Sequence, residues 1–225
     1  MIALARDDAH KVTDVLRMRS GDGVVIVDSA AHAYNASLQF ERDAVRATLD
    51  ERLPAGESQT LRVTLAQAIP KGQKLDFVVE KATELGITRL IPLYTSRSIG
   101  QASQHKLERW QKLARSAAAQ SGRSTVPQIE APLEFAALLP RIAAFDAAIF
   151  AWELATAPLR GALREIGTVK NVLAIVGPEG GFSHAEAEAA VGAGARAVSL
   201  GTRILRTETA PLVMLAALLY ESGEL

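Results

Sequence analysis

Cysteine is absent from the 225 residues of this chain, and its four histidines are scattered along the sequence. Without thiols the chain cannot form disulfides, thiolate zinc sites or iron–sulfur clusters, and it has no cysteine nucleophile. The histidines also lack any metal-ligand spacing; they are His10, His32, His105 and His184. The sequence therefore predicts a protein without a metal, suited to a reducing compartment.

Long hydrophobic runs are missing as well. The longest, residues 210–220, contains Pro211 and is much shorter than the roughly 18–20 residues that a membrane span needs. Near the start of the chain, the apolar residues reach Arg6 too soon for the core of a signal peptide. We therefore expect a cytoplasmic protein that does not associate with membranes.

Net charge is zero, because 25 basic residues balance 25 acidic ones, and 48% of the residues are hydrophobic. This composition is typical of a globular protein and excludes both a disordered chain and a uniformly basic nucleic-acid coat. The charge is uneven, however, because residues 87–128 hold seven bases and one acid, a local charge of +6. Such a segment favours a polyanion-binding face, although a solvated helix face has the same composition.

Two patterns of hydrophobic spacing divide the chain near residue 58. Residues 1–58 contain short alternating runs separated by turn residues, which predicts a small β-barrel or sandwich. These runs lie at 24–27, 33–40 and 45–49. In residues 59–225, strand-like runs alternate with segments of helical period, which predicts an α/β domain. Its sheet should be mostly parallel, with helices on both faces and ligand sites at the carboxyl ends of the strands.

The elements of the second domain follow from the spacing of apolar residues. Strands are expected at 62–66, 89–93, 147–152, 172–176 and 197–200. Helices are expected near 75–85, 105–120, 133–142 and 159–166, then from Ser183 and from about Glu208. In the first helix, five apolar residues share one face before Gly86 at the C-cap position: Leu75, Val78, Val79, Ala82 and Leu85. In the last helix, Leu212, Leu215, Ala216 and Leu219 form an apolar face that suits either the core or an interface.

A glycine-rich loop follows the strand expected at 172–176. Its glycines lack a Cβ, so the backbone is free to approach a ligand closely. The next residues, Ser183 and Glu186, form a capping box that begins a helix. A tight turn between strand and helix would need the same residue types.

Common nucleotide-binding and hydrolase motifs are absent. The sequence has no G-K-[ST] ending typical of a Walker loop, and the G-x-G at 192–194 leaves a helix instead of opening one. No G-x-S-x-G elbow and no Ser-His-Asp arrangement is present. The sequence therefore does not indicate binding of a nucleoside triphosphate or a dinucleotide, or hydrolysis by a serine nucleophile.

Residues 200–210 form a second unusual loop, before the last expected helix. The loop places two arginines and a carboxylate beside apolar side chains, which costs free energy unless the polar groups meet partners or a ligand. Glu208 and Thr209 also suit a helix N-terminus, so capping explains them equally well. For Arg206, which lies between an apolar pair and the helix start, we favour a functional role.

Together, these two loops resemble the RsmE family of SPOUT-class RNA methyltransferases. The resemblance depends on G-P-E-G-G-F-S at 177–183 and L-G-T-R-I-L-R-T-E-T-A at 200–210. Other matching segments are K-G-Q-K-L-D at 71–76, K-A-T-E-L-G at 81–86, T-S-R-S at 95–98 and Q-S-G-R at 120–123. His10, V-L-R at 15–17 and G-D at 21–22 look like the family's N-terminal RNA-binding domain. Ala119 departs from the family pattern, which usually has an acidic residue there.

The resemblance implies an enzyme that uses S-adenosylmethionine to methylate N3 of a uridine in 16S ribosomal RNA, either free or in the small ribosomal subunit. It implies a PUA-like β-barrel over 1–58 that binds RNA and a SPOUT-type parallel sheet over 59–225. In that sheet the C-terminal segment threads through a loop to form a trefoil knot, which periodicity alone would not predict. It also implies a homodimer in which Arg123 of one chain approaches the substrate of the other.

The same resemblance implies the site residues. The cofactor pocket would be lined by Gly177, Pro178, Glu179, Gly180, Gly181, Leu200, Gly201, Ile204, Leu205, Arg206, Thr209 and Ala210. We expect Arg206 to stabilise the uracil anion that forms when N3 loses its proton, with Glu208 the weaker candidate for the proton acceptor. The residues expected to contact RNA are His10, Arg17, Arg97, Arg115 and Arg123.

Two other functions are compatible with these motifs. The chain could be a catalytically inactive RNA-binding or ribosome-assembly factor, which would not need an intact cofactor site. It could also be a methyltransferase that acts on tRNA, because the motifs do not specify the RNA.

Overall fold

The computed structural model describes residues 1–28, 32–42, 44–53, 61–100, 102–166 and 169–225. The chain forms two compact units, Met1–Ser58 and Gln59–Leu225. Within the described residues, no helix is long and apolar enough to cross a membrane.

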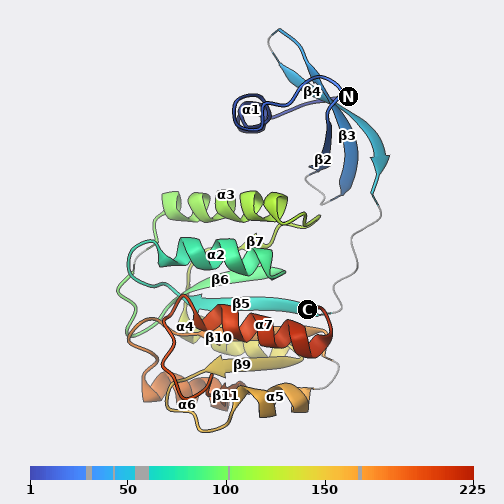
Figure 1. Cartoon of the computed structure of the whole chain (residues 1–225). Coiled ribbons are helices and arrows are strands. Elements are labelled where there is room, and N and C mark those ends of the chain that lie inside the picture. Colours follow the sequence, from blue (N-terminus) through green and yellow to red (C-terminus); the bar gives the residue numbers. More distant parts are fainter. Residues whose placement is uncertain (29–31, 43, 54–60, 101, 167–168) are drawn as a thin grey trace. The chain divides into compact units, whose positions relative to one another are not determined.

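The first unit is an antiparallel sheet with the strand order β1-β4-β3-β2 (Figure 1). Its strands are β1 (Ile2–Ala3), β2 (Gly23–Val27), β3 (Ala33–Phe40) and β4 (Val45–Arg52). Alternate residues of β3 and β4 form its small core; they are Ala36, Leu38, Val45 and Ala47. The three predicted strands are confirmed, and closure of the sheet into a barrel stays a prediction. The helices α1 (Arg6–His10) and η1 (Lys11–Val15) were not predicted.

The second unit is built on a parallel sheet with the order β11-β9-β10-β5-β6-β7, in which β8 also pairs with β6. Its strands are β5 (Arg62–Ala68), β6 (Arg89–Tyr94), β7 (Gln128–Ile129), β8 (Leu133–Glu134), β9 (Ala147–Ala151), β10 (Asn171–Val176) and β11 (Arg196–Val198). Each of their pairings is parallel, which confirms the predicted α/β class. The carboxyl ends of the strands therefore meet at one edge.

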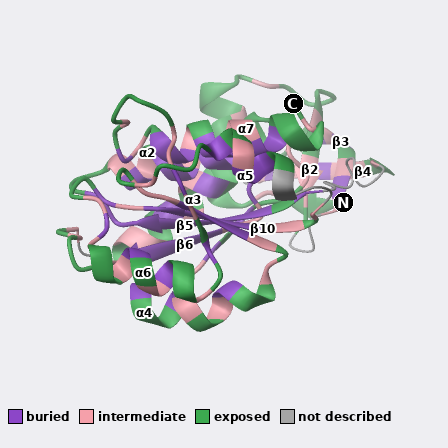
Figure 2. Ribbon diagram, turned by 90° about the horizontal axis from the view of Figure 1, so that it is seen from below, coloured by how far each residue is buried: buried purple, intermediate pink, exposed green. Residues whose placement is uncertain are grey.

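Helices cover both faces of this sheet (Figure 2). They are α2 (Lys74–Glu84), α3 (Gln104–Gln120), α4 (Phe135–Leu138), η2 (Leu139–Ala144), α5 (Leu159–Ile166), α6 (His184–Gly192) and α7 (Ala210–Ser222). Apolar residues of α2, α3, α5 and α7 share one core cluster, whereas those of α4, η2 and α6 belong to the cluster on the opposite face.

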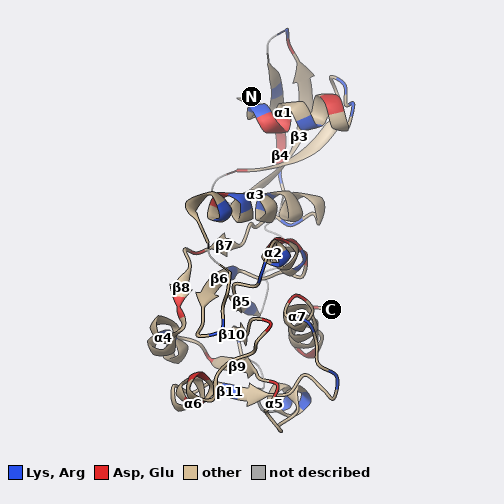
Figure 3. Ribbon diagram, turned by 90° about the vertical axis from the view of Figure 1, so that its left-hand side faces the viewer, with Lys and Arg blue, Asp and Glu red and all other residues tan. Residues whose placement is uncertain are grey.

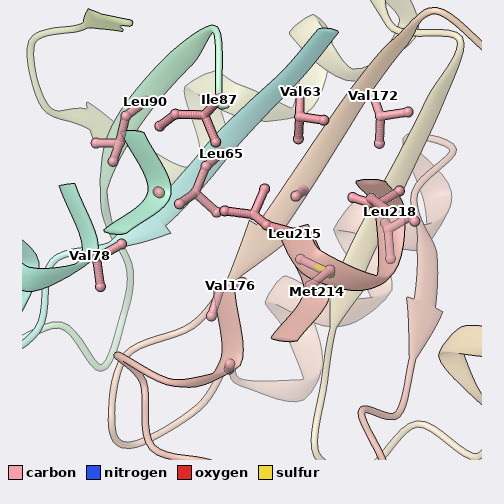
Figure 4. Packing of buried hydrophobic residues seen from close by; sticks show 14 of the residues in the cluster. Val63, Leu65, Val78, Ile87, Leu90, Val172, Val176, Met214, Leu215 and Leu218 are labelled. Atoms are coloured by element: carbon pink, nitrogen blue, oxygen red, sulfur yellow. The ribbon is translucent and has the colours of Figure 1, made fainter. Parts of the chain in front are cut away.

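The central strands β5 and β10 separate the two clusters. In β10, Val172 and Val176 point to the face of α7, and Leu173 points to the opposite face. This alternation explains why the strand is apolar at consecutive positions, since both of its faces are buried. On the α7 side, Met214, Leu215 and Leu218 lie over β5 and β10 (Figure 4). Leu215 and Leu219 thus belong to the core, one of the two roles that the sequence left open.

One predicted element is wrong. Residues 133–142 were expected to form a single helix, but the chain forms β8 first, then the short α4 and then the 3-10 helix η2. Pro140 lies at the beginning of η2 and cannot donate the backbone hydrogen bond that a continuing α-helix needs. Leu133 and Glu134 instead pair with β6.

The outer side of β11 contacts another part of the same chain. Ser199 forms a parallel bridge with Pro158, its amide donates to Ala157 O (2.8 Å), and its carbonyl accepts from Leu159 N (3.0 Å). The segment before α5 therefore pairs with this edge of the sheet where β11 ends.

Candidate active site

A cleft of about 400 Å³ lies where β9, β10 and β11 end. Its volume falls within the range of small-molecule sites, roughly 300–1,000 Å³. It is lined by Lys74, residues 151–153, residues 176–179, Gly181, Phe182, residues 199–207 and Ala210. The two loops singled out in the sequence therefore meet at one cavity, at the carboxyl edge where parallel sheets bind ligands.

A buried hydrogen-bond network joins the two loops at the base of the cleft. Thr207 Oγ1 donates to the carbonyl of Gly177 (2.7 Å). The fully buried side chain of Gln67, at the end of β5, donates from Nε2 to Thr207 Oγ1 (3.2 Å) and towards Gly177 O (3.4 Å). Three segments far apart in sequence are thus held together by side chains that cannot exchange their partners for water.

Arg97, in the loop after β6, braces the glycine-rich loop. Its Nη1 donates to the carbonyl of Gly180 (2.8 Å), and a Cβ built on Gly180 would lie 3.4 Å from Arg97 Cβ. Glycine at 180 thus lets the arginine side chain pack against the backbone of the loop.

Glu186 adds a second brace. Its carboxylate accepts from the amide and hydroxyl of Ser183, completing the predicted capping box, and from Ser96 N (2.7 Å) and Ser96 Oγ (2.8 Å). Burial raises the pKa of Glu186, but the hydrogen bonds from Ser96 and Ser183 outweigh it, so the pKa lies below its ordinary 4.5. The loop after β6 is therefore linked to the start of α6.

Lys74, at the start of α2, faces two carboxylates of the site. Its Nζ lies 2.8 Å from Glu179 Oε1 and 3.7 Å from Glu208 Oε2. The hydrogen bond to Glu179 raises the pKa of Lys74. Burial raises the pKa of Glu179, yet this bond and the bond from the amide of Lys71 lower it below its ordinary value. At neutral pH both groups are charged.

The second loop is far more exposed. Ile204 is 93% exposed, and the side chain of Arg206 is 83% exposed with its Nη1 4.0 Å from Glu208 Oε1. The carboxylate of Glu208 is mostly buried, and its Oε2 has no hydrogen-bond partner in the described part of the chain. An arginine at the cleft that is not held by the fold can contact a substrate.

Most of the residues expected around the cofactor line this cleft. They are Gly177, Pro178, Glu179, Gly181, Leu200, Gly201, Ile204, Leu205, Arg206 and Ala210. Gly180, Thr209 and Glu208 lie beside it and are not part of its wall. Sequence reasoning missed Gln67, Lys74, Glu153 and Thr207. Their only signal was position, since Gln67 and Glu153 stand at or just after the carboxyl end of a strand.

The five residues expected to bind RNA have different surroundings. His10 and Arg17 are exposed in the first unit, and Arg115 is exposed on α3, where Lys and Arg recur along the helix (Figure 3). Arg97 holds Gly180, as described above. Arg123 donates to the carbonyls of Thr83 (2.7 Å) and Ile87 (3.1 Å), so its guanidinium closes the end of α2 within its own chain. Within the described residues, no cluster of three or more potential metal ligands is present.

Comparison with known proteins identifies the family. The model of the RNA methyltransferase domain family matches residues 57–219. The chain is 36% identical to ribosomal RNA small subunit methyltransferase E of Synechocystis (96% of this chain, 71% of the relative) and 31% identical to that of Bacillus subtilis (98% and 90%). The crystal structure of the Neisseria gonorrhoeae methyltransferase E, bound to S-adenosyl methionine, superposes with a TM-score of 0.88 at 32% identity, covering 97% of this chain and 91% of that one. The chain therefore belongs to the RNA methyltransferase family that contains ribosomal RNA small subunit methyltransferase E.

Proposed function

We propose that this protein is an S-adenosylmethionine-dependent methyltransferase that modifies N3 of a uridine in 16S ribosomal RNA. The observation that carries the proposal is the cleft formed by the two family motifs, in a chain similar over nearly its full length to enzymes named for the small-subunit ribosomal RNA. The related Neisseria structure contains S-adenosyl methionine.

The residues of the cleft fit this cofactor. The volume suits a molecule of that size, and the wall combines apolar Val176, Leu200 and Leu205 with the exposed backbone of the glycine-rich loop. Apolar side chains would pack against the adenine while backbone groups recognise its edge. When bound, S-adenosylmethionine supplies a methyl group on a positively charged sulfur.

Arg206 is our candidate for the residue that acts on the target base. N3 of uridine carries a proton at neutral pH, so its removal leaves negative charge on the uracil ring. The exposed guanidinium at the cleft can hold a uracil oxygen and stabilise that charge. Glu208 is the weaker candidate for the proton acceptor, supported by its Oε2, which accepts no hydrogen bond from any residue that the structure describes.

We propose that RNA is bound by the basic α3 and by the first unit acting as a PUA-like domain. The exposed cations Lys112 and Arg115 on α3 support this (Figure 3). Arg109 contributes less, because it pairs with Asp76 (2.6 Å). Binding should weaken steeply with salt, since each phosphate contact releases counterions. A flat response to salt would contradict the proposal.

We propose that the C-terminal segment forms a trefoil knot and that two copies form a dimer. For the knot, support comes from the path of the chain, which leaves β11 at the edge of the sheet and returns as α7 over the central strands β5 and β10. For the dimer, support comes from Phe77 of α2 and Val213 of α7, which remain 45% and 39% exposed on neighbouring helices. The intrachain bonds of Arg123 argue against its reaching a partner's substrate.

The test is incubation of the purified protein with methyl-labelled S-adenosylmethionine and 16S ribosomal RNA, small subunits or tRNA. Mass analysis of the nucleosides should find N3-methyluridine in the ribosomal samples. If the label enters tRNA and neither of the ribosomal samples, the protein is instead a tRNA methyltransferase. Absence of both product and cofactor binding would favour an RNA-binding factor without activity.

A further inference from the structure

Glu153 is a carboxylate of the cleft to which neither the sequence motifs nor the proposed reaction gives a role. It follows β9, lines the cavity and is exposed to solvent. Its Oε1 lies so close to Gly181 that a Cβ built there would be 2.1 Å away, and Gly181 has a φ of +66°, which side chains rarely adopt. The glycine thus leaves room for the carboxylate against the glycine-rich loop.

The other carboxylates around the site are neutralised. Glu179 is bound by Lys74, and Glu208 lies within 4.0 Å of Lys74 and Arg206. Glu153 differs, because among the residues that the structure describes no basic group lies within ion-pair distance of it and no hydrogen bond holds it. A negative charge in a ligand cleft without a partner favours a cationic ligand.

The donor and the product of the proposed reaction differ in charge at one atom. As the sulfur–carbon bond breaks, its electron pair stays on sulfur, the methyl carbon bonds to N3, and the N3 proton leaves to the proton acceptor. The sulfonium, with one positive charge, thereby becomes a neutral thioether. The amino and carboxyl groups of the molecule are unchanged, so only an interaction with the sulfonium charge distinguishes the two forms electrostatically.

We propose that Glu153 is a specificity-determining residue that recognises the positive charge of S-adenosylmethionine, so that the cleft binds the donor more tightly than S-adenosylhomocysteine. The inference depends on the proposed function, because it assigns a residue to that cofactor. The preference promotes exchange of product for donor after each turnover, since the attraction disappears with the transferred methyl group.

The test compares the binding of S-adenosylmethionine and S-adenosylhomocysteine by calorimetry, without RNA. Glu153→Gln keeps the shape that lies against Gly181 and removes the charge. We expect it to raise the Kd of the donor roughly three- to tenfold, as for a partly solvated charge pair, and to change the Kd of the product less than twofold. Glu153→Asp should recover part of the preference. Glu188→Gln, at an exposed position of α6, is the matched control and should leave both constants unchanged.

The outcomes separate the two proposals. If Glu153→Gln weakens both ligands equally, the residue serves the loop or the amino group and the inference is overturned. An unchanged donor Kd overturns it as well, while the proposed function stands as long as the wild-type protein binds the donor and methylates RNA. A wild-type protein that does not bind S-adenosylmethionine would overturn both.

Discussion

The two loops of the cleft are held in different ways. The glycine-rich loop, residues 177–183, receives side chains from two distant parts of the unit: Arg97 on Gly180 and Lys74 on Glu179. The carboxylate of Glu186 caps the end of the loop at Ser183 and links it to Ser96. The second loop, called the arginine loop below and taken as residues 199–209, is held near both of its ends. The Ser199 hydroxyl contacts Gly201 near its start, and the Thr207 hydroxyl bonds to Gly177 O near its end. Between these points lie the exposed Ile204 and Arg206.

This difference separates two tasks. A loop braced from several sides is pre-organised, so a cofactor that binds to it loses little free energy to ordering. A loop fixed only near its ends can adjust to a large substrate at the cost of some ordering when it binds. The glycine-rich loop thus suits the cofactor, and the exposed part of the arginine loop, which also lines the cleft, suits RNA.

The largest effect should come from Arg206, the exposed member of the arginine loop. If it stabilises charge on the uracil, Arg206→Ala should lower the single-turnover methylation rate by roughly a hundredfold, with smaller changes in the affinity for cofactor and RNA. Arg206→Lys should recover part of the rate, since an ammonium keeps the charge but not the planar fork. Arg160→Ala, at an exposed position of α5 away from the cleft wall, is the control. A normal rate in Arg206→Ala would exclude the role and turn attention to Glu208→Gln.

Removing the Thr207 anchor should loosen both loops, because its hydroxyl joins them. Thr207→Val loses the bond to Gly177 O and leaves that carbonyl with only the long contact from Gln67. The free energy of unfolding should fall by about 1–3 kcal/mol, the cost of a buried polar group without its partner. Urea denaturation measures it. Thr207→Ser keeps the hydroxyl and should lose less; equal losses in both variants would show that the methyl group, not the bond, matters.

One glycine in each loop can be replaced to test how rigidly that loop is held. Gly201, in the arginine loop, has a φ of +118° with open space around its Cβ position, so Gly201→Val should distort the loop by backbone strain alone. We expect its affinity for S-adenosylmethionine to fall about tenfold. Gly180→Val in the braced loop should have a smaller effect, because Gly180 does not have a left-handed φ and its added Cβ would come no closer than 3.4 Å to the Arg97 side chain. A larger loss for Gly180→Val would reverse our assignment of the rigid loop.

The smallest effect concerns pH. Because the pKa of Glu186 is lower in the folded protein, its ionised form stabilises the fold at pH above about 4.5, and this contribution is lost as pH falls through the lower folded value. Glu186→Gln should lower the unfolding free energy at pH 7 by roughly 1 kcal/mol, the scale of a net hydrogen bond, and the loss should shrink as the pH falls through the folded pKa of Glu186. Glu188→Gln on the same helix should show no such dependence.

Hydrophobic periodicity predicted the parallel sheet and nearly all of its helices, whereas the meeting of the two motif loops at one pocket was implied by the resemblance to the RsmE family. Sequence reasoning missed Gln67 and Glu153, since one polar residue at the end of a strand carries no periodic signal. It also could not foresee that Arg97 and Arg123 bond to backbone carbonyls of their own chain. Charge is visible in a sequence, whereas the partner of a charge depends on the tertiary fold.

The pairing of Ser199 with the segment at Pro158 has a consequence for self-association. An open edge strand offers its backbone groups to any passing chain, and this is the usual route to aggregation of sheet proteins. Here the chain itself occupies those groups where β11 ends, and Pro158 has no amide hydrogen to extend the ladder outward. Strand addition by a second copy of the protein is therefore blocked at this end of the sheet.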